Sequence, residues 1–166
     1  AGSDGLLFLP ALSGSNSPRI NGYARGIFFG LTMRHTLAHM TRAVYEGNSY
    51  AFRDNIERLN AMGMKDAKII ATGGGTRSPL WMQIKADMIG KEIQIVNNPE
   101  PTALGAAMLA GVAQKNFSSF GEAAEALLEY GRVYTPNPTL KGIYDDMYGF
   151  YRELYFGNEK LFEHYH

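Results

Sequence analysis

The stretch that decides the fold is Gly73-Gly74-Gly75-Thr76-Arg77-Ser78-Pro79, near the middle of the sequence. It follows the apolar run Lys68–Thr72, which predicts a buried strand, and it opens a helical pattern over Pro79–Ile89. Three consecutive glycines leave no Cβ at the end of the strand, so a ligand can approach the backbone closely and positive φ is available. A strand, a glycine turn and a helix in succession are typical of α/β proteins.

Two residues at the end of the turn favour ligand binding at the start of the predicted helix. Ser78 is a preferred N-cap residue, and Pro79 suits the first helical turn. A helix N-terminus presents free N–H groups and a positive dipole end, and ligands of open α/β sheets bind beyond the carboxyl ends of strands. The stretch has neither the Gly-Lys-Ser/Thr ending of a Walker A loop nor the spacing of a Rossmann fingerprint. From these residues alone, a nucleotide-binding turn and a plain structural turn both remain open.

Strands and helices alternate along the rest of the chain, which predicts an α/β layer with some parallel pairing. Further strands are predicted over Leu6–Leu9, Gly26–Gly30 and Glu92–Val96, and further helices over Thr36–Met62, Thr102–Gln114, Phe120–Leu128 and Leu140–Phe156. Residues Ser13–Gly22 are rich in Ser, Asn, Gly and Pro and predict a loop. Inside the first long helix, Gly47-Asn48-Ser49 is unfavourable for a helix, so either the helix bends there or another backbone approaches it closely.

The composition narrows the class of protein. The 166 residues suit one domain, and 45 % hydrophobic residues predict a packed core. Lys plus Arg and Asp plus Glu both total 16, and this balance argues against a nucleic-acid partner. There is no cysteine, which suits the cytoplasm, and no apolar stretch approaches the ~20 residues that cross a bilayer, so we expect no membrane association.

Two pairs of side chains have a spacing that occurs in functional sites. His35 and His39 are four residues apart and would share a helix face, as zinc ligands do, but no Glu follows His35 and no third ligand is near. We therefore expect two helix-surface or cleft-edge histidines and no metal site. Asp54 and Glu57 also share a helical face, and with Arg53 beside them we expect a solvated face rather than acid–base chemistry.

Aromatic residues gather in the last predicted helix, at Tyr144, Tyr148, Phe150, Tyr151, Tyr155 and Phe156. Aromatic platforms that stack bases also need interleaved basic residues, and here only Lys141 and Arg152 are present. We expect this helix to dock its aromatic stripe on the domain. For Trp81 we expect core packing, and for Asp87 a structural or surface position.

Four segments, in order, resemble the FGGY family of carbohydrate kinases, and among its members most resemble the xylulokinases. They are Gly5–Pro10 with Leu12-Ser13-Gly14, then Ala24–Thr32, Thr72–Ile84 and Glu100–Ala107. The resemblance implies part of a ribonuclease-H-like domain of the actin and hexokinase type, an α/β fold with a mixed sheet and packed helices. Residues 1–166 would form a single partial domain, the C-terminal nucleotide-binding region. The sequence departs from the family pattern at Ser15-Asn16, where members often have Glu-Arg.

The resemblance also implies the roles of the turn residues. Gly74 and Gly75 would lie against the adenosine of ATP, Ser78 would face the adenine edge, and Gly73 and Thr76 would shape the turn. Gly105 and Ala106 would lie in a small-residue helix behind the nucleotide, by packing rather than contact. Magnesium would be held through ATP and water, with no metal ligand from this chain.

By the same resemblance, the catalytic Asp, the loop that holds the phosphates and the N-terminal sugar domain lie outside these residues. We therefore expect no catalytic residue here and no kinase activity of the 166-residue chain alone, although the whole protein would phosphorylate a sugar hydroxyl. The alternative is a non-catalytic nucleotide-binding or interaction module of actin-like fold. Surplus apolar surface makes a homodimer plausible.

Overall fold

A computed structural model describes residues 1–65, 67–98 and 100–164. Its strands are β1 (Leu7–Leu9), β2 (Ile27–Phe29), β3 (Ile69–Ala71), β4 (Ile93–Val96) and β5 (Tyr130–Tyr134). Its α-helices are α1 (Leu37–Ala61), α2 (Pro79–Ile89), α3 (Pro101–Ala113), α4 (Phe120–Leu127), α5 (Lys141–Gly157) and α6 (Glu159–His164). Three short 3₁₀ turns complete the description: η1 (Gly2–Gly5), η2 (Gly74–Arg77) and η3 (Pro138–Leu140).

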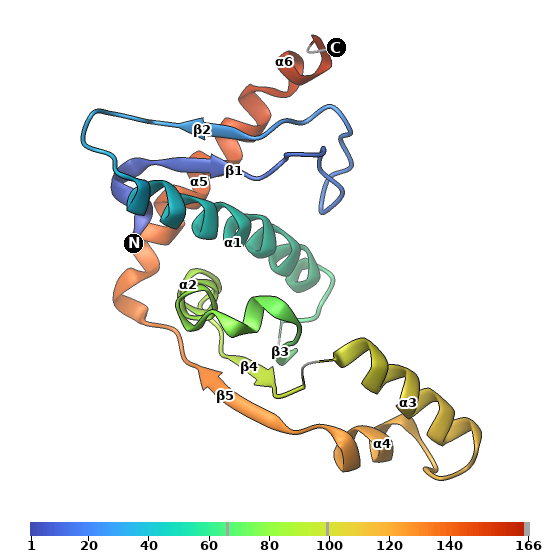
Figure 1. Cartoon of the computed structure of the whole chain (residues 1–166). Coiled ribbons are helices and arrows are strands. Elements are labelled where there is room, and N and C mark those ends of the chain that lie inside the picture. The colour runs from blue at the N-terminus through green and yellow to red at the C-terminus, as the bar shows by residue number, and fades with distance from the viewer. Residues whose placement is uncertain (66, 99, 165–166) are drawn as a thin grey trace.

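The strands form two small sheets on either side of the long helix α1 (Figure 1). In the first sheet β1 and β2 pair antiparallel, and in the second β3 pairs parallel with β4 while β5 pairs antiparallel with β4. The predicted mixed α/β architecture is confirmed. Strand β3 is not buried as predicted, because it lies at the edge of its sheet with β4 as its partner, and Ile70 is 47 % exposed.

Helix α1 passes Gly47 without a break, which decides between the two alternatives for Gly47-Asn48-Ser49. A Cβ at Gly47 would lie 2.1 Å from the carbonyl oxygen of Phe8, so the glycine lets the backbone of β1 touch the helix. The cost of a glycine in a helix is thus offset by a close packing of α1 on the first sheet. The predicted approach of another backbone is correct.

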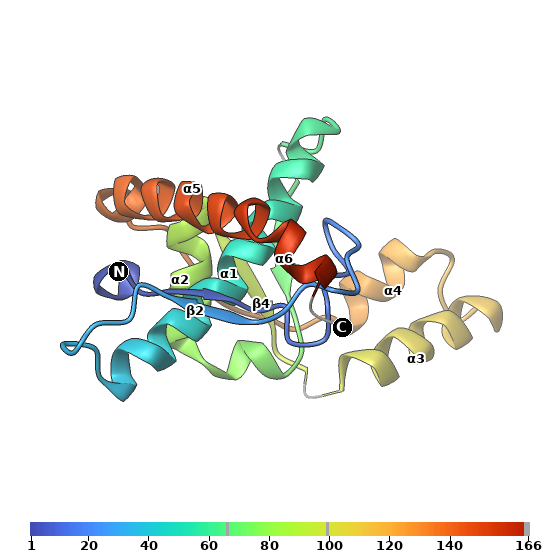
Figure 2. The ribbon, with the colours of Figure 1, turned by 90° about the horizontal axis from the view of Figure 1, so that it is seen from above.

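Helix α5 supplies much of the core, as its aromatic stripe predicts. Tyr144, Tyr148, Tyr151 and Tyr155 are all buried, at spacings of four, three and four residues, which places them on one face of the helix. The ring of Tyr50 from α1 lies 5.3 Å from that of Tyr151 and 6.2 Å from that of Tyr148, centroid to centroid. Figure 2 shows α5 lying along one side of the body, next to α2 and α1.

The expectation of a solvated face at Asp54 is wrong. Asp54 is buried, and its carboxylate accepts hydrogen bonds from the hydroxyl of Tyr148 and from Nη1 of Arg19, each at 2.5 Å. The reason is that α5 packs against this side of α1 and brings its tyrosines onto the carboxylate. Glu57 stays only partly exposed and pairs with Arg53 at 2.9 Å.

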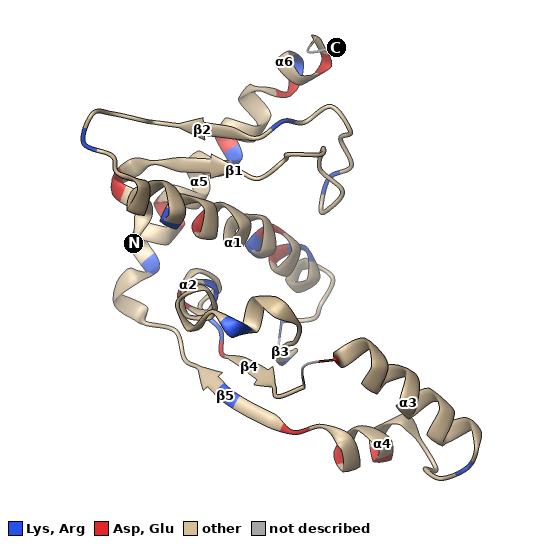
Figure 3. Cartoon of the chain, viewed as in Figure 1, with Lys and Arg blue, Asp and Glu red and all other residues tan. Residues whose placement is uncertain are grey.

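Helices α3 and α4 pack on each other and project from the body (Figures 1 and 2). Helix α3 carries no charged side chain (Figure 3), and Ala106 on it is exposed. Open space surrounds the position where Gly105 would carry a Cβ. The expected packing of Gly105 and Ala106 is therefore not seen among the described residues, because α3 contacts α4 rather than the body.

Two further expectations about single residues are met. The ring of Trp81 stacks on that of Tyr45, with centroids 5.6 Å apart, and its indole N–H donates to Oγ of Ser49 at 3.1 Å. Asp87 is buried and structural, since it accepts hydrogen bonds from Nε2 of Gln83 and from the backbone N–H of Asn137, both at 2.8 Å. No helix among the described residues has the length and apolar character needed to cross a membrane.

Candidate functional site

The candidate site lies where the parallel strands β3 and β4 end. The register pairs Ala71 with Ile95, so the glycine turn that follows β3 lies beside the asparagines that follow β4. A cavity with a volume of about 300 Å³ is open there. It is lined by Gly73, Thr76, Arg77, Ile95, Val96, Asn97 and Asn98. This is the edge of an α/β sheet at which ligands usually bind.

Gly73 has a conformation that only glycine adopts without strain. Its φ is +87° and its ψ is −173°, and it caps the 3₁₀ turn η2. Thr76 fixes this geometry, because both its backbone N–H and its hydroxyl donate to the carbonyl oxygen of Gly73, at 3.1 and 2.7 Å. The two residues that were expected to shape the turn therefore do so.

Gly74 and Gly75 differ in what a side chain would meet at each position. A Cβ at Gly74 would meet no atom of the described chain within 4 Å, so packing does not demand a glycine there. A Cβ at Gly75 would lie 3.3 Å from the ring of Trp81, so this glycine makes room for the indole. The missing side chain at Gly74 leaves its backbone open to a ligand.

Ser78 caps helix α2, as predicted. Its Oγ accepts a hydrogen bond from the backbone N–H of Trp81 at 3.3 Å, and Pro79 occupies the first helical position. Because this bond uses only a lone pair, the hydroxyl hydrogen remains able to donate to a ligand. Helix α2 then ends at Gly90 in the left-handed conformation, the predicted end point.

The cavity contains only part of the predicted site and adds residues that sequence reasoning missed. Of the five predicted residues, Gly73 and Thr76 line it, whereas Gly74, Gly75 and Ser78 lie outside its wall. Arg77, Asn97 and Asn98 are the polar additions. The signal for the asparagines was their position directly after a predicted strand, at the same sheet edge as the glycines.

The electrostatics around the turn are weakly positive. Arg77 is exposed at the cavity and brings a guanidinium to its rim. Lys85, two turns into α2, lies with its Nζ 4.1 Å from the centroid of the Trp81 ring, and burial lowers the pKa of its ammonium group. Both positive groups suit a ligand that carries negative charge or a π-face.

The two histidines lie elsewhere and are arranged differently from the expectation. His35 precedes α1, so the pair does not share a helix face, and the two rings meet edge to face with centroids 5.6 Å apart. His39 Nε2 lies 3.5 Å from a carboxylate oxygen of Asp4. Over residues 1–65, 67–98 and 100–164, no group of three His, Cys, Asp or Glu side chains is placed to hold a metal ion.

Residues 1–114 match the model of the FGGY family of carbohydrate kinases, C-terminal domain. The chain belongs to the FGGY family. The match contains the glycine turn and the asparagines, so the whole candidate site lies within the FGGY C-terminal domain.

Among FGGY proteins, the chain is similar to a xylulose kinase of Staphylococcus epidermidis, with 32 % identity over 160 residues, 96 % of this chain and 32 % of the relative. The crystal structure of xylulose kinase from Rhodospirillum rubrum superposes with a TM-score of 0.86 at 34 % identity, over 98 % of this chain and 32 % of that one. The ligand-bound xylulose kinase from Lactobacillus acidophilus gives a TM-score of 0.87 at 30 % identity, over 100 % of this chain and 34 % of that one.

These similarities establish the fold as the ribonuclease-H-like fold of FGGY kinases, of the actin and hexokinase type. The chain spans about a third of the length of the curated relatives that it matches, with 32 % of the first.

Proposed function

We propose that this protein is an ATP-dependent carbohydrate kinase, and that the present chain supplies the surface for the adenosine end of ATP. The sugar would be a pentulose, D-xylulose, by analogy with the xylulose kinases to which the chain is similar. The observation that carries the proposal is the open backbone at Gly74, at the carboxyl ends of two parallel strands and beside a cavity of about 300 Å³.

Each part of the turn has a use in holding the nucleotide. The bare backbone at Gly74 and Gly75 lets the adenosine lie against the chain, while Gly73 and Thr76 keep the turn in shape. The hydroxyl of Ser78 offers its hydrogen to the adenine edge. ATP supplies the phosphoryl group, and the residues of this chain bind and orient its base end.

The Mg²⁺ that accompanies ATP would be held through the phosphates and water, as this ion commonly is, rather than by carboxylates of this chain. Phosphoryl transfer depends on positioning and on neutralising charge around the γ-phosphate. The groups for that task, including a catalytic Asp, and the sugar site would belong to other parts of the protein. Residues 1–166 then act as one partial domain, the C-terminal nucleotide-binding region of a cytoplasmic enzyme.

A calorimetric titration with ATP tests the role of the turn. Gly74→Val adds a branched side chain where a Cβ would meet no atom of the described chain within 4 Å, and we expect ATP affinity to fall about tenfold or more. Gly149→Val is the matched control, because Gly149 lies on α5 and is equally open. Equal ATP affinity of Gly74→Val and the parent protein would show that the nucleotide lies elsewhere.

A second experiment tests the sugar. The full-length protein is assayed with MgATP and a panel of D-xylulose, gluconate and glycerol, and ADP release is followed. We expect D-xylulose to give the highest kcat/KM. A higher value for gluconate or glycerol would overturn the choice of substrate while leaving the nucleotide assignment intact.

A further inference from the structure

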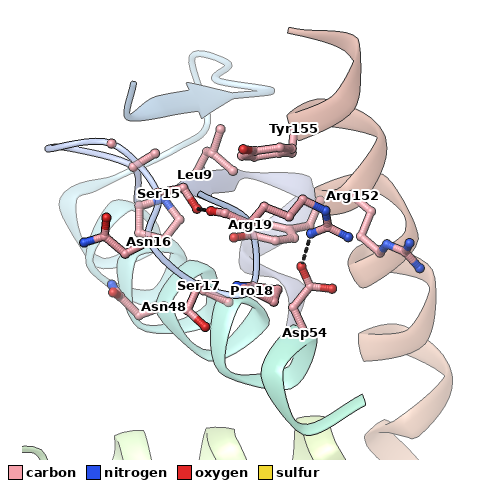
Figure 4. A pocket seen from close by; sticks show the side chains of 15 residues that line it. Leu9, Ser15, Asn16, Ser17, Pro18, Arg19, Asn48, Asp54, Arg152 and Tyr155 are labelled. Atoms are coloured by element: carbon pink, nitrogen blue, oxygen red, sulfur yellow. Dashed lines mark hydrogen bonds and ion pairs between the residues drawn. The ribbon is translucent and has the colours of Figure 1, made fainter. Parts of the chain in front are cut away.

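A second cavity lies on the opposite side of α1 from the glycine turn, between the loop 13–19, α1 and α5 (Figure 4). Its volume is about 280 Å³, just below the usual range of about 300–1,000 Å³ for ligand pockets, so it suits a small ligand. Its polar lining includes Ser15, Asn16, Arg19, Asp54, Arg152 and Tyr155. None of these residues belongs to the candidate nucleotide site.

The hydroxyl of Tyr155 is the first sign that this cavity takes a ligand. Tyr155 is 6 % exposed, and its hydroxyl has no hydrogen-bond partner among the described residues. A buried hydroxyl without a partner costs free energy, so such groups usually have a use. Figure 4 shows the Tyr155 ring laid across one side of the cavity, with its hydroxyl end towards the loop.

The charges of the cavity favour an anion. Arg19 is neutralised by Asp54, with its Nη1 2.5 Å from a carboxylate oxygen. Arg152 has no ion pair or hydrogen bond within the part of the chain that the structure describes, and its guanidinium lies 5.9 Å from the ring centroids of Tyr148 and Phe156. The positive charge of Arg152 is thus available to pair with an anionic ligand.

The donors at the cavity match a phosphate group better than a carboxylate. The hydrogen-bond donors among the lining residues include the guanidinium of Arg152, the hydroxyl of Tyr155 and the exposed side-chain amide of Asn16. A phosphate monoester presents three acceptor oxygens, and Arg binds such groups with two parallel hydrogen bonds. The buried side chains of Leu9 and Ala11 form an apolar wall for a short carbon chain.

We propose that this cavity binds a small phosphate ester, at a site separate from that of the nucleotide. Arg152 holds the phosphate at the rim, and the hydroxyl of Tyr155 donates to one of its oxygens. Because that hydroxyl is closed to solvent, the loop 13–19 has to shift when the ligand enters. The proposal does not depend on the sugar that the kinase uses.

Calorimetric titration of the protein with glycerol 3-phosphate tests the site. We expect binding that weakens about tenfold in Tyr155→Phe and in Arg152→Gln, since each removes a hydrogen bond to a charged group. Tyr130→Phe and Arg132→Gln on β5 are the matched controls, and Gly74→Val separates this site from the nucleotide site. All three should bind glycerol 3-phosphate as the parent protein does.

Two further probes identify the source of the phosphate group. Inorganic phosphate that binds as tightly as the ester would make the free anion the ligand, and weaker binding would confirm the need for a carbon chain. Gluconate carries a carboxylate instead, and it should bind more weakly than the ester. Tighter binding of gluconate would overturn the proposal, as would unchanged ester affinity in both site variants or no binding of either phosphate probe.

A stability measurement without ligand separates binding from a structural role. Tyr155→Phe removes only the unpartnered oxygen, so the midpoint of thermal unfolding should rise by about 2–4 °C. A lower midpoint would show that the hydroxyl stabilises the fold through a partner of its own, and the ligand role would be refuted.

Discussion

The hydroxyl of Tyr148 on α5 donates a hydrogen bond to the buried carboxylate of Asp54 on α1, with the oxygens 2.5 Å apart. This bond joins residues that are 94 positions apart in the sequence, and a guanidinium, Arg19, completes the carboxylate's partners. The bond ties the aromatic helix α5 to the helix α1, on which the first sheet packs.

Tyr148→Phe should therefore lower the free energy of unfolding by about 1–2 kcal/mol, because the carboxylate of Asp54 loses one buried donor and keeps the other. Urea unfolding followed by circular dichroism measures this. Tyr130→Phe, on the exposed side of β5, should change the free energy by less than about 0.5 kcal/mol. Equal effects of the two variants would mean that the bond contributes nothing.

Two alanine substitutions in helices should have opposite effects. Gly47→Ala would place its Cβ 2.1 Å from the carbonyl oxygen of Phe8, and we expect a loss of about 1–3 kcal/mol or more. Gly149→Ala meets open space on α5 and should stabilise the protein by about 0.5–1 kcal/mol. Thermal unfolding of both variants checks the prediction, and a tolerated Gly47→Ala would contradict the close approach of β1 to α1.

The turn glycines predict a separation of stability from binding. Gly73→Ala forces a side chain into φ +87° and should cost about 1–2 kcal/mol of stability. Gly74→Ala has open space and should leave stability within about 0.5 kcal/mol while weakening ATP binding. Chemical unfolding and ATP titration on the same two proteins give the comparison, and the reverse order of stabilities would refute it.

Stability should fall in alkaline solution through Tyr144. Burial, and then the nearby Glu46 carboxylate, raise the pKa of Tyr144 to about 12 from the ordinary value of 10.0. Because the pKa is raised in the folded state, the contribution of this tyrosine is fully present below pH ~10 and is lost as the pH rises towards ~12. Between these two pH values, this tyrosine lowers the free energy of unfolding by about 1.4 kcal/mol per pH unit. Urea unfolding between these values should show a smaller slope for Tyr144→Phe than for the parent protein.

The 166-residue chain alone should not phosphorylate a sugar. We assign the surface for adenosine to this chain. We assign the group that activates the sugar hydroxyl to another part of the protein. An assay with MgATP and D-xylulose, with a complete xylulose kinase as positive control, measures this. ATP-dependent phosphorylation by the purified chain, above the level of a Gly74→Val preparation, would contradict the division of labour proposed here.

Local signals predicted much of the fold. Helix α2 begins at Pro79 and ends at Ile89 as expected, because a serine cap, a proline and a following glycine mark both ends. Strand β5 was missed, since Gly131 interrupts its pattern. The space beside that glycine is occupied from outside the strand, since a Cβ there would lie 2.3 Å from Oδ1 of the Asn97 side chain.

The candidate site was predicted in part for a similar reason. The glycine turn carries its own signal, whereas Asn97 and Asn98 join the cavity only because β4 pairs in parallel with β3. The burial of Asp54 could not be predicted from the sequence either, because its partner Tyr148 comes from a helix far along the chain. The spacing of residues along the sequence predicts which side chains are neighbours within one helix or strand. The contacts of Asn97, Asn98 and Asp54 are made between different elements, so spacing does not predict them.

The tyrosines of α5 have a consequence for synthesis on the ribosome. Leu7, Leu9 and Tyr50 are made early, but the core that they share is closed by Tyr144, Tyr148, Tyr151 and Tyr155, close to the end of these 166 residues. Until those tyrosines emerge, the apolar sides of β1 and α1 are exposed to the cell. We therefore expect a nascent chain of this protein to be prone to aggregation until translation has passed residue 155 and the helix has left the exit tunnel.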